Sequence, residues 1–136
     1  KEFTEGLGPL ADGVTSSTWW HHATSYNNTI GPWTSTAAFY KDFVAKFERD
    51  PDYVHGSCAA AADVLVNAVQ KAGSTDKKAV RDALAATDVL TFYGPIDFGD
   101  NGMNQGREMP IIQVQGDDIK VLYPASIADA QMKTIN

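Results

Sequence analysis

The pattern of apolar positions between residues 56 and 102 predicts two consecutive helices followed by a strand. In the first helix, small and aliphatic side chains recur every three or four positions and form one apolar stripe. The residues of this stripe are Ala61, Val64, Leu65, Ala68 and Ala72. Gly73 ends this helix, and Ser74 or Thr75 caps the second one. The predicted buried positions of the second helix are Val80, Ala83 and Leu84.

The second half of the chain changes to a two-residue alternation, which predicts strands. The first of these strands runs from Phe92 to Phe98 and is followed by a Gly-rich turn at residues 99–102. Two further strands are expected at Ile111–Val114 and Ile119–Tyr123. The intervening Gly116–Asp118 has the composition of a hairpin turn, so the sequence predicts a C-terminal β-hairpin.

The N-terminal third reads as the end of a helix over residues 1–8, a strand at Val14–Trp20 and a polar loop at residues 21–34. An amphipathic helix is expected at Ser35–Glu48. Its aromatic side chains recur every four residues, which predicts that they are buried on one face. These residues are Phe39, Phe43 and Phe47.

The amino-acid composition excludes several classes of function. Of the 136 residues, 43% are hydrophobic and 21% are charged, as in a soluble globular domain. The net charge of -6 argues against a nucleic-acid partner and against adhesion to anionic lipid, both of which require a basic face. The single cysteine, Cys58, allows no disulfide within the chain. The sequence lacks a signal peptide and opens at Lys1 without a Met, which is what a truncated chain would show.

Several motifs together resemble a known family. They are ADGV at residues 11–14, KAGS at 71–74, D-x-x-AVRDAL at 76–84, YGPIDFGDNG at 93–102 and IIQVQGDDIKVLYP at 111–124. In this order and spacing they resemble the C-terminal part of type I periplasmic solute-binding proteins of the branched-chain amino-acid type. The resemblance implies an α/β fold: the C-terminal portion of a two-lobed protein with three-layer α/β/α lobes.

The resemblance also implies how the chain divides. Residues 1–18 and 113–136 would be pieces of one lobe, and residues 19–112 a piece of the other. The chain would cross between lobes at Val14–Trp19 and at Met109–Ile112, and the lobes would close around a ligand by hinge motion. Such a piece would expose apolar surface, so we expect it to pair with the missing N-terminal part, to dimerise, or to be a protease-resistant core.

The double tryptophan at the end of the first strand is the leading candidate for ligand contact. Adjacent side chains on a strand point to opposite faces, so one indole packs in a core and the other meets solvent or a ligand. In the family resembled, residues just after this strand line the cleft. This implies ligand-binding roles for Trp19, Trp20 and His21, with Trp20 and His21 favoured. The alternative is that both indoles pack against the helix at residues 35–48.

Tyr53 and His55 form the second candidate, because in similar proteins an aromatic residue before the following helix covers the ligand. An alanine run, Ala59–Ala62, stands where many members of the family carry a tyrosine. We expect no metal site, because adjacent His21 and His22 point in opposite directions and nearby Cys or carboxylate ligands are absent from the sequence.

These observations predict a binding protein that is not an enzyme and has no cofactor. The complete protein would be the periplasmic or extracytoplasmic solute-binding component of an ABC transporter. It would bind a small amino-acid-like solute, or an aromatic or apolar carboxylate, between its lobes and deliver it to the membrane permease. Two alternatives remain open: a cytoplasmic ligand-sensing regulator of the same fold, and a hydrolase that uses Cys58 with His55.

Overall fold

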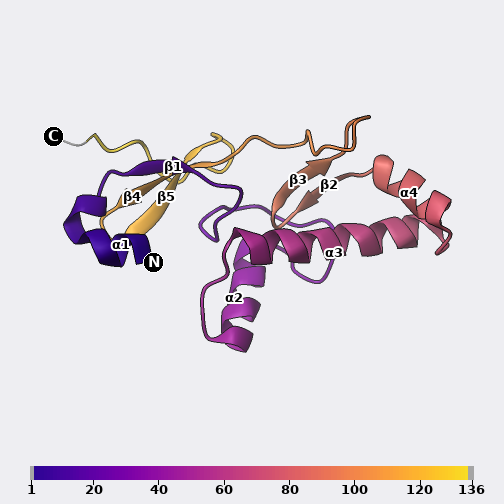
Figure 1. Cartoon of the computed structure of the whole chain (residues 1–136), viewed down its shortest axis with the longest axis horizontal. Coiled ribbons are helices and arrows are strands. Elements are labelled where there is room, and N and C mark those ends of the chain that lie inside the picture. The colour runs from indigo at the N-terminus through magenta and orange to yellow at the C-terminus, as the bar shows by residue number, and fades with distance from the viewer. Residues whose placement is uncertain (1, 135–136) are drawn as a thin grey trace.

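The computed structural model describes residues 2–134, and its elements fall into two groups joined by two extended segments (Figure 1). The first group, which we call the sheet unit, comprises α1 (Glu2–Leu7), the 3-10 helix η1 (Gly8–Ala11), β1 (Thr15–Ser17), β4 (Ile111–Gln115) and β5 (Asp118–Tyr123). The second group, the helical unit, comprises α2 (Thr36–Phe47), α3 (Tyr53–Ala72), α4 (Lys77–Ala85), β2 (Asp88–Thr91) and β3 (Gly94–Asp97).

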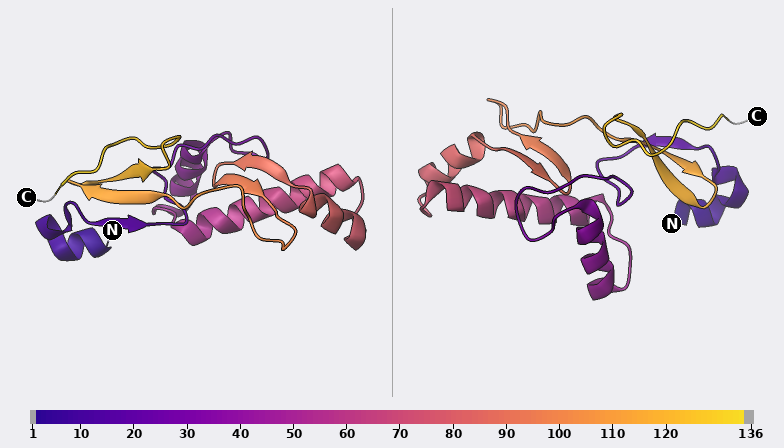
Figure 2. Two further views of the ribbon diagram at one scale, coloured as in Figure 1. Left: turned by 90° about the horizontal axis from the view of Figure 1, so that it is seen from above. Right: turned by 180° about the vertical axis from the view of Figure 1, so that it is seen from behind.

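The sheet unit contains an antiparallel three-stranded sheet in the order β1-β4-β5. The predicted C-terminal hairpin is confirmed as β4 and β5. The predicted strand at Val14–Trp20 is shorter, since only Thr15–Ser17 pairs with β4. It ends because the Thr18 hydroxyl accepts from the Trp20 N–H at 3.3 Å and lies 2.9 Å from the Trp20 carbonyl, which turns the backbone out of the ladder. Both chain ends described lie on this side of the molecule (Figure 2).

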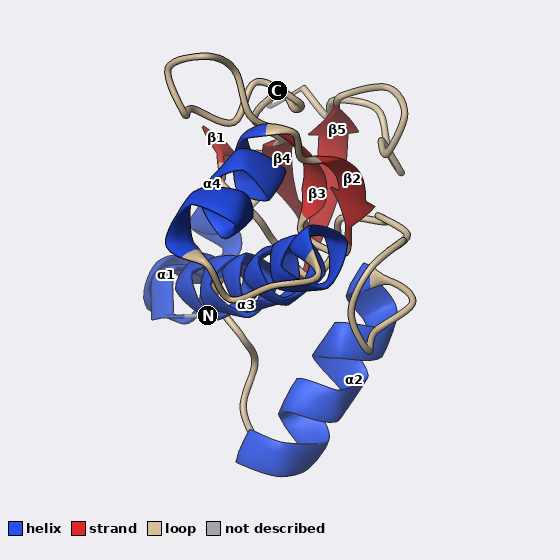
Figure 3. Cartoon of the chain, turned by 90° about the vertical axis from the view of Figure 1, so that its right-hand side faces the viewer, coloured by secondary structure: helices blue, strands red, loops and turns tan. Residues whose placement is uncertain are grey.

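Helix α2 matches the predicted amphipathic helix. The Ser35 hydroxyl accepts a hydrogen bond from the Ala38 N–H and caps its first turn. Phe39 and Phe43 are buried as expected, but Phe47 is 50% exposed. The exposure follows from the direction of α2, which projects away from the rest of the helical unit in both Figure 1 and Figure 3. The far end of the helix therefore leaves its aromatic face uncovered.

Helix α3 begins earlier than the sequence predicts. The Asp52 carboxylate accepts from the N–H groups of Val54 and His55, so Tyr53 and His55 belong to the first turn and not to the segment before it. The end at Gly73 is confirmed, with that glycine in the left-handed conformation. The buried face differs in part from the predicted stripe: it comprises Gly56, Ala60, Asp63, Val64 and Ala68, while Ala61 and Leu65 are exposed.

The hairpin β2–β3 replaces the single strand predicted at Phe92–Phe98. Asp88–Thr91 pairs with Gly94–Asp97, and Phe92 and Tyr93 form the turn between them. Helix α4 is capped by Asp76, not by Ser74 or Thr75, because the Asp76 carboxylate accepts from the first-turn N–H groups. Its predicted apolar positions, Val80, Ala83 and Leu84, are half-buried.

An aromatic core fills the helical unit. Its buried members are Trp20, Phe39, Phe43, Ala60, Val64, Phe92, Tyr93 and Ile96. A second, smaller cluster of Tyr26, Val121 and Ile127 lies between the two units, with Ala23, Leu90 and Ile112 at its edge. The predicted lobe ranges 1–18, 19–112 and 113–136 stay a prediction, and their residues 1, 135 and 136 lie outside the described part of the chain.

Candidate functional site

The two tryptophans after β1 have opposite environments. Trp20 is 2% exposed, its indole N–H donates to the Phe92 carbonyl at 3.2 Å, and its ring meets Phe39 edge-to-face. Trp19 is 55% exposed. The structure thus matches the expected division into one core indole and one outward indole. However, it places Trp20, the favoured ligand contact, in the core and leaves Trp19 available.

Trp19 borders a pocket of about 420 Å³ at the junction of the two units. The other lining residues are Tyr93, Ile96, Asn104, Arg107 and Met109. Arg107 donates to the backbone carbonyl of Trp19 and to that of Tyr93, each at 2.5 Å. The pocket thus combines an exposed indole and apolar side chains with a fixed cation. Sequence reasoning missed Arg107, since it lies in what reads as a polar connection.

The expectation that His21 and His22 point in opposite directions is wrong, because the chain has left the strand before these residues and their rings lie side by side. His21 is the first of three rings that stack on one another. Its ring lies 4.2 Å from that of His22, which in turn lies 4.3 Å from that of Tyr40, and the Tyr40 hydroxyl bonds the Asp50 carboxylate at 2.8 Å. Burial, together with the neighbouring His22, lowers the pKa of His21 to about 4. Its Nδ1 accepts from the Ala23 N–H at 3.1 Å, as a neutral imidazole must.

Tyr53 and His55 point into different surroundings although both lie in the first turn of α3. Tyr53 is 48% exposed. His55 contacts Asp52 through Nδ1 at 2.6 Å and Arg49 through Nε2 at 2.9 Å, and its ring packs edge-on against Phe43. Both nitrogens of His55 are therefore engaged in holding the beginning of the helix.

The start of α3 lies beside the segment that follows β1, because the Trp20 indole packs on Gly56. This packing brings the residues around Trp19 and His21 toward the helix end that carries Tyr53. His55 does not join them. It borders a separate groove of about 490 Å³ between α2 and α3, together with Cys58 and the aromatic face of α2.

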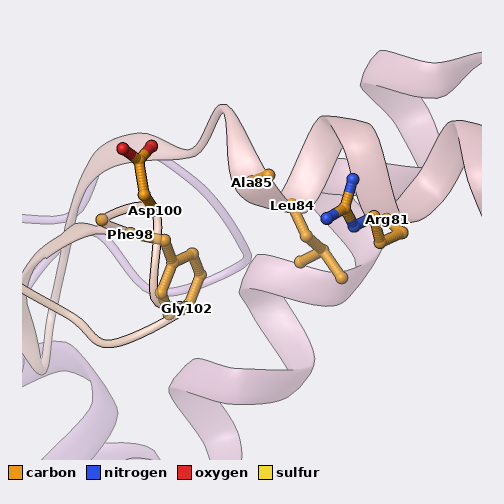
Figure 4. Close-up of a pocket in the computed structure, with 7 residues that line it drawn as sticks. Arg81, Leu84, Ala85, Phe98, Asp100 and Gly102 are labelled. Atoms are coloured by element: carbon orange, nitrogen blue, oxygen red, sulfur yellow. The ribbon is translucent and has the colours of Figure 1, made fainter.

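Another pocket, of about 530 Å³, lies between α4 and the loop after β3. Figure 4 shows Leu84 and Phe98 inside it, with the charged groups of Arg81 and Asp100 at opposite sides. These charges do not converge on a common point. Among residues 2–134, three or more His, Cys, Asp or Glu side chains nowhere gather in a geometry that holds a metal ion. None of the helices in the described part of the chain is long and apolar enough to cross a membrane.

Comparison with known proteins gives the family. A profile described as periplasmic binding protein matches residues 3–118. The chain therefore belongs to the periplasmic binding protein family, and the sequence-based resemblance is confirmed. Among solved structures it is similar to the leucine binding protein LivK from Thermotoga maritima MSB8, with a TM-score of 0.64 and 20% identity. The match covers 88% of this chain and 33% of LivK, so the chain spans about one third of that protein's length.

The fold is accordingly that of part of a type I periplasmic binding protein, a mixed α/β architecture as predicted. The family description, periplasmic binding protein, is that of solute-binding proteins.

Proposed function

We propose that this chain is the C-terminal part of an extracytoplasmic solute-binding protein of an ABC importer. The solute is a small amino acid or an aromatic or apolar carboxylate, held between two lobes and passed to a membrane permease. One observation carries the proposal: an exposed tryptophan, Trp19, lies at the junction where two antiparallel segments join the two units. Aromatic side chains next to a hinge cover the apolar part of a ligand when the lobes close.

The residues proposed to contact the solute are Trp19, His21 and Tyr53. Trp19 and His21 follow the end of β1, and Tyr53 is the first residue of α3. The packing of Trp20 on Gly56 supports their proximity. Trp20 and His55 support the site from behind, through the core and the helix cap. The groups that bind the charged end of the solute are assigned to the N-terminal part of the protein, which would also cover the exposed apolar faces of α2 and α3.

The first test is a solute panel on the full-length receptor. LivK is a leucine binding protein, so leucine and other branched amino acids head the panel, followed by phenylalanine and simple aromatic carboxylates. A bound solute raises the melting temperature by mass action, and calorimetry then gives its affinity. Saturable one-to-one binding of any panel member supports the proposal. Absence of binding to every amino acid and carboxylate would sink it.

Two alternatives have their own tests. A cytoplasmic regulator of the same fold would lack a leader peptide, so cell fractionation of the full-length protein separates it from an importer component. A hydrolase would need His55 to activate Cys58, but both nitrogens of His55 already contact Asp52 and Arg49. Alkylation of the exposed Cys58 should therefore leave solute binding unchanged. Loss of a hydrolytic activity on alkylation would instead support the hydrolase.

A further inference from the structure

Two segments connect the sheet unit with the helical unit, and they lie side by side where they leave the sheet. Ser17, the last residue of β1, pairs with Ile111, the first residue of β4. One residue further on, the Thr18 N–H donates to the Pro110 carbonyl at 3.0 Å. On the sheet side, backbone hydrogen bonds therefore hold the two segments together.

On the helical side, the side chain of Arg107 holds the two segments together. Arg107 Nη2 donates to the Trp19 carbonyl in the first segment, and Nη1 donates to the Tyr93 carbonyl in the β2–β3 turn. The guanidinium also lies 4.1 Å from the centre of the Tyr93 ring, a cation–π contact. Gly94 leaves space for this arrangement, because a Cβ there would lie 3.2 Å from Arg107 Cδ.

Only a short stretch separates these two anchored regions. Within residues 2–134, Glu108 and Met109 make no backbone hydrogen bond, whereas Pro110 and Arg107 on either side of them are held. Within residues 2–134 the units also meet in the apolar cluster around Tyr26 and Val121, which has no directional bonds and allows sliding. The Tyr123 hydroxyl of β5 donates to the Glu108 carboxylate, so Glu108 is tied to the sheet unit through its side chain. The bend between the units is thereby confined to Thr18 in one segment and Glu108–Met109 in the other.

We propose that Arg107 fixes the position of the hinge. Its guanidinium makes the ends of both segments move as one body with the helical unit, so that closure follows one path. It is a positioning residue, because it acts on the solute site through the Trp19 backbone. Without it, the backbone of the second segment would have no hydrogen bond from Arg107 to Met109, while Gly106 stays bonded to Asn104, and the Trp19 carbonyl would lose its donor. The inference rests on the proposed function only where solute affinity is concerned.

The test measures the distance between the units in the full-length receptor without solute. Spin labels at Lys77 and Asp117, both exposed on this chain, report on the helical and sheet units in a Cys58→Ala background. Arg107→Gln should broaden the distance distribution relative to the wild type. The matched control is Arg81→Gln, an exposed arginine of the same unit, which should leave the distribution unchanged. Equal widths in all three proteins would overturn the proposal.

A second variant guards against simple loss of folding. Arg107→Lys keeps the positive charge but reaches only one of the two carbonyls, so an intermediate width is expected. If Lys restores the full wild-type width, charge alone suffices and the two-carbonyl tether is wrong. Solute affinity of the Arg107 variants is measured in a separate experiment. If only about one tenth of the variant molecules can still bind solute, the apparent affinity falls about tenfold. Because the distances need no solute, failure to find a ligand leaves the hinge test intact.

Discussion

The indole of Trp20 lies against the α-carbon of Gly56 so closely that a Cβ at that position would come within 3.0 Å of ring atoms Cδ2 and Cε3. Tyr93 closes the same space from another side, 3.3 Å from that Cβ. Gly56 has ordinary helical geometry, so its role is to permit close approach and not an unusual backbone conformation. Through this contact the segment after β1 is placed on the first turn of α3.

Gly56→Ala should therefore destabilise the full-length protein, although alanine favours helix. Alanine gains about 1 kcal/mol in helix propensity, and overpacking against a buried ring costs about 1–3 kcal/mol. We expect a net loss of about 1 kcal/mol in denaturant unfolding. In a Trp20→Phe background the smaller ring gives way, so the same change should become neutral or stabilising. If Gly56→Ala lowers the unfolding free energy equally in both backgrounds, the contact with Trp20 is not the cause of the destabilisation.

The two tryptophans give a paired prediction. Trp19→Ala should weaken solute binding by about 1–3 kcal/mol while leaving the melting temperature nearly unchanged, because the ring is exposed and outside the core. Trp20→Ala should lower stability by about 3–5 kcal/mol, since it leaves a cavity among Phe39, Phe92 and Tyr93. Calorimetry and thermal unfolding on both variants separate the roles. If Trp20→Ala weakens solute binding and Trp19→Ala does not, then Trp20 and not Trp19 contacts the solute.

Elements with one clear pattern were predictable from the sequence. The hairpin β4–β5 carries turn residues between two alternating runs, and α2 carries a serine cap followed by a four-residue aromatic repeat. Helix α3 was predicted in type, but only Val64 and Ala68 of its predicted stripe belong to the buried face. Its alanine-rich sequence offers several adjacent apolar rows, and only the aromatic side chains contributed by other segments decide which row is covered.

The candidate site was less predictable because its contacts are distant in sequence. Arg107 reaches Trp19 across 88 positions, and Trp20 reaches Phe92 across 72. The alternation along the strand predicted that one indole would be buried, but it could not tell which one. That choice depends on the turn at Thr18, where a side-chain hydroxyl bonds the Trp20 backbone and ends the strand early.

The half-buried His21 predicts that the stability of the fold depends on pH. Burial and the neighbouring His22 lower the pKa of His21 from 6.5 to about 4 in the folded protein, so the unfolded chain takes up the proton more readily. Stability should be unaffected above about pH 6.5. It should fall as the pH drops from there toward 4, by roughly 3 kcal/mol over the whole window. Burial lowers the pKa of His22 too, against the opposing charge of Asp50, so it acts in the same direction.

His21→Asn is the matched variant for this effect. Its side-chain oxygen can still accept the Ala23 N–H that now bonds Nδ1, but the residue does not titrate. Melting temperatures between pH 4 and 8 should therefore decline less steeply in the variant than in the wild type. Parallel curves for the two proteins would mean that His21 does not contribute to the acid sensitivity.

Gly31 and Asp63 give the last prediction. A Cβ at Gly31 would clash with the Asp63 carboxylate, and Gly31 has a φ of +76°, which side chains rarely adopt. Asp63 is buried on α3, and burial raises the pKa of its carboxyl, an effect that the Asn28 amide opposes. Within residues 2–134, the buried atoms Asp63 Oδ2 and Asn28 Nδ2 have no well-formed hydrogen bond. The loop at residues 28–31 is thus fitted closely around a carboxylate that gains little from burial.

Gly31→Ala should cost about 2–3 kcal/mol of unfolding free energy, part from the left-handed backbone and part from the clash. Asp63→Ala removes the clashing atoms and a weakly satisfied buried carboxylate, so alone it should cost much less. In the double variant only the backbone cost of Gly31→Ala should remain. The expected coupling is about 1 kcal/mol or more in a double-mutant cycle. Strict additivity would mean that the loop moves aside and that the contact does not hold it against α3.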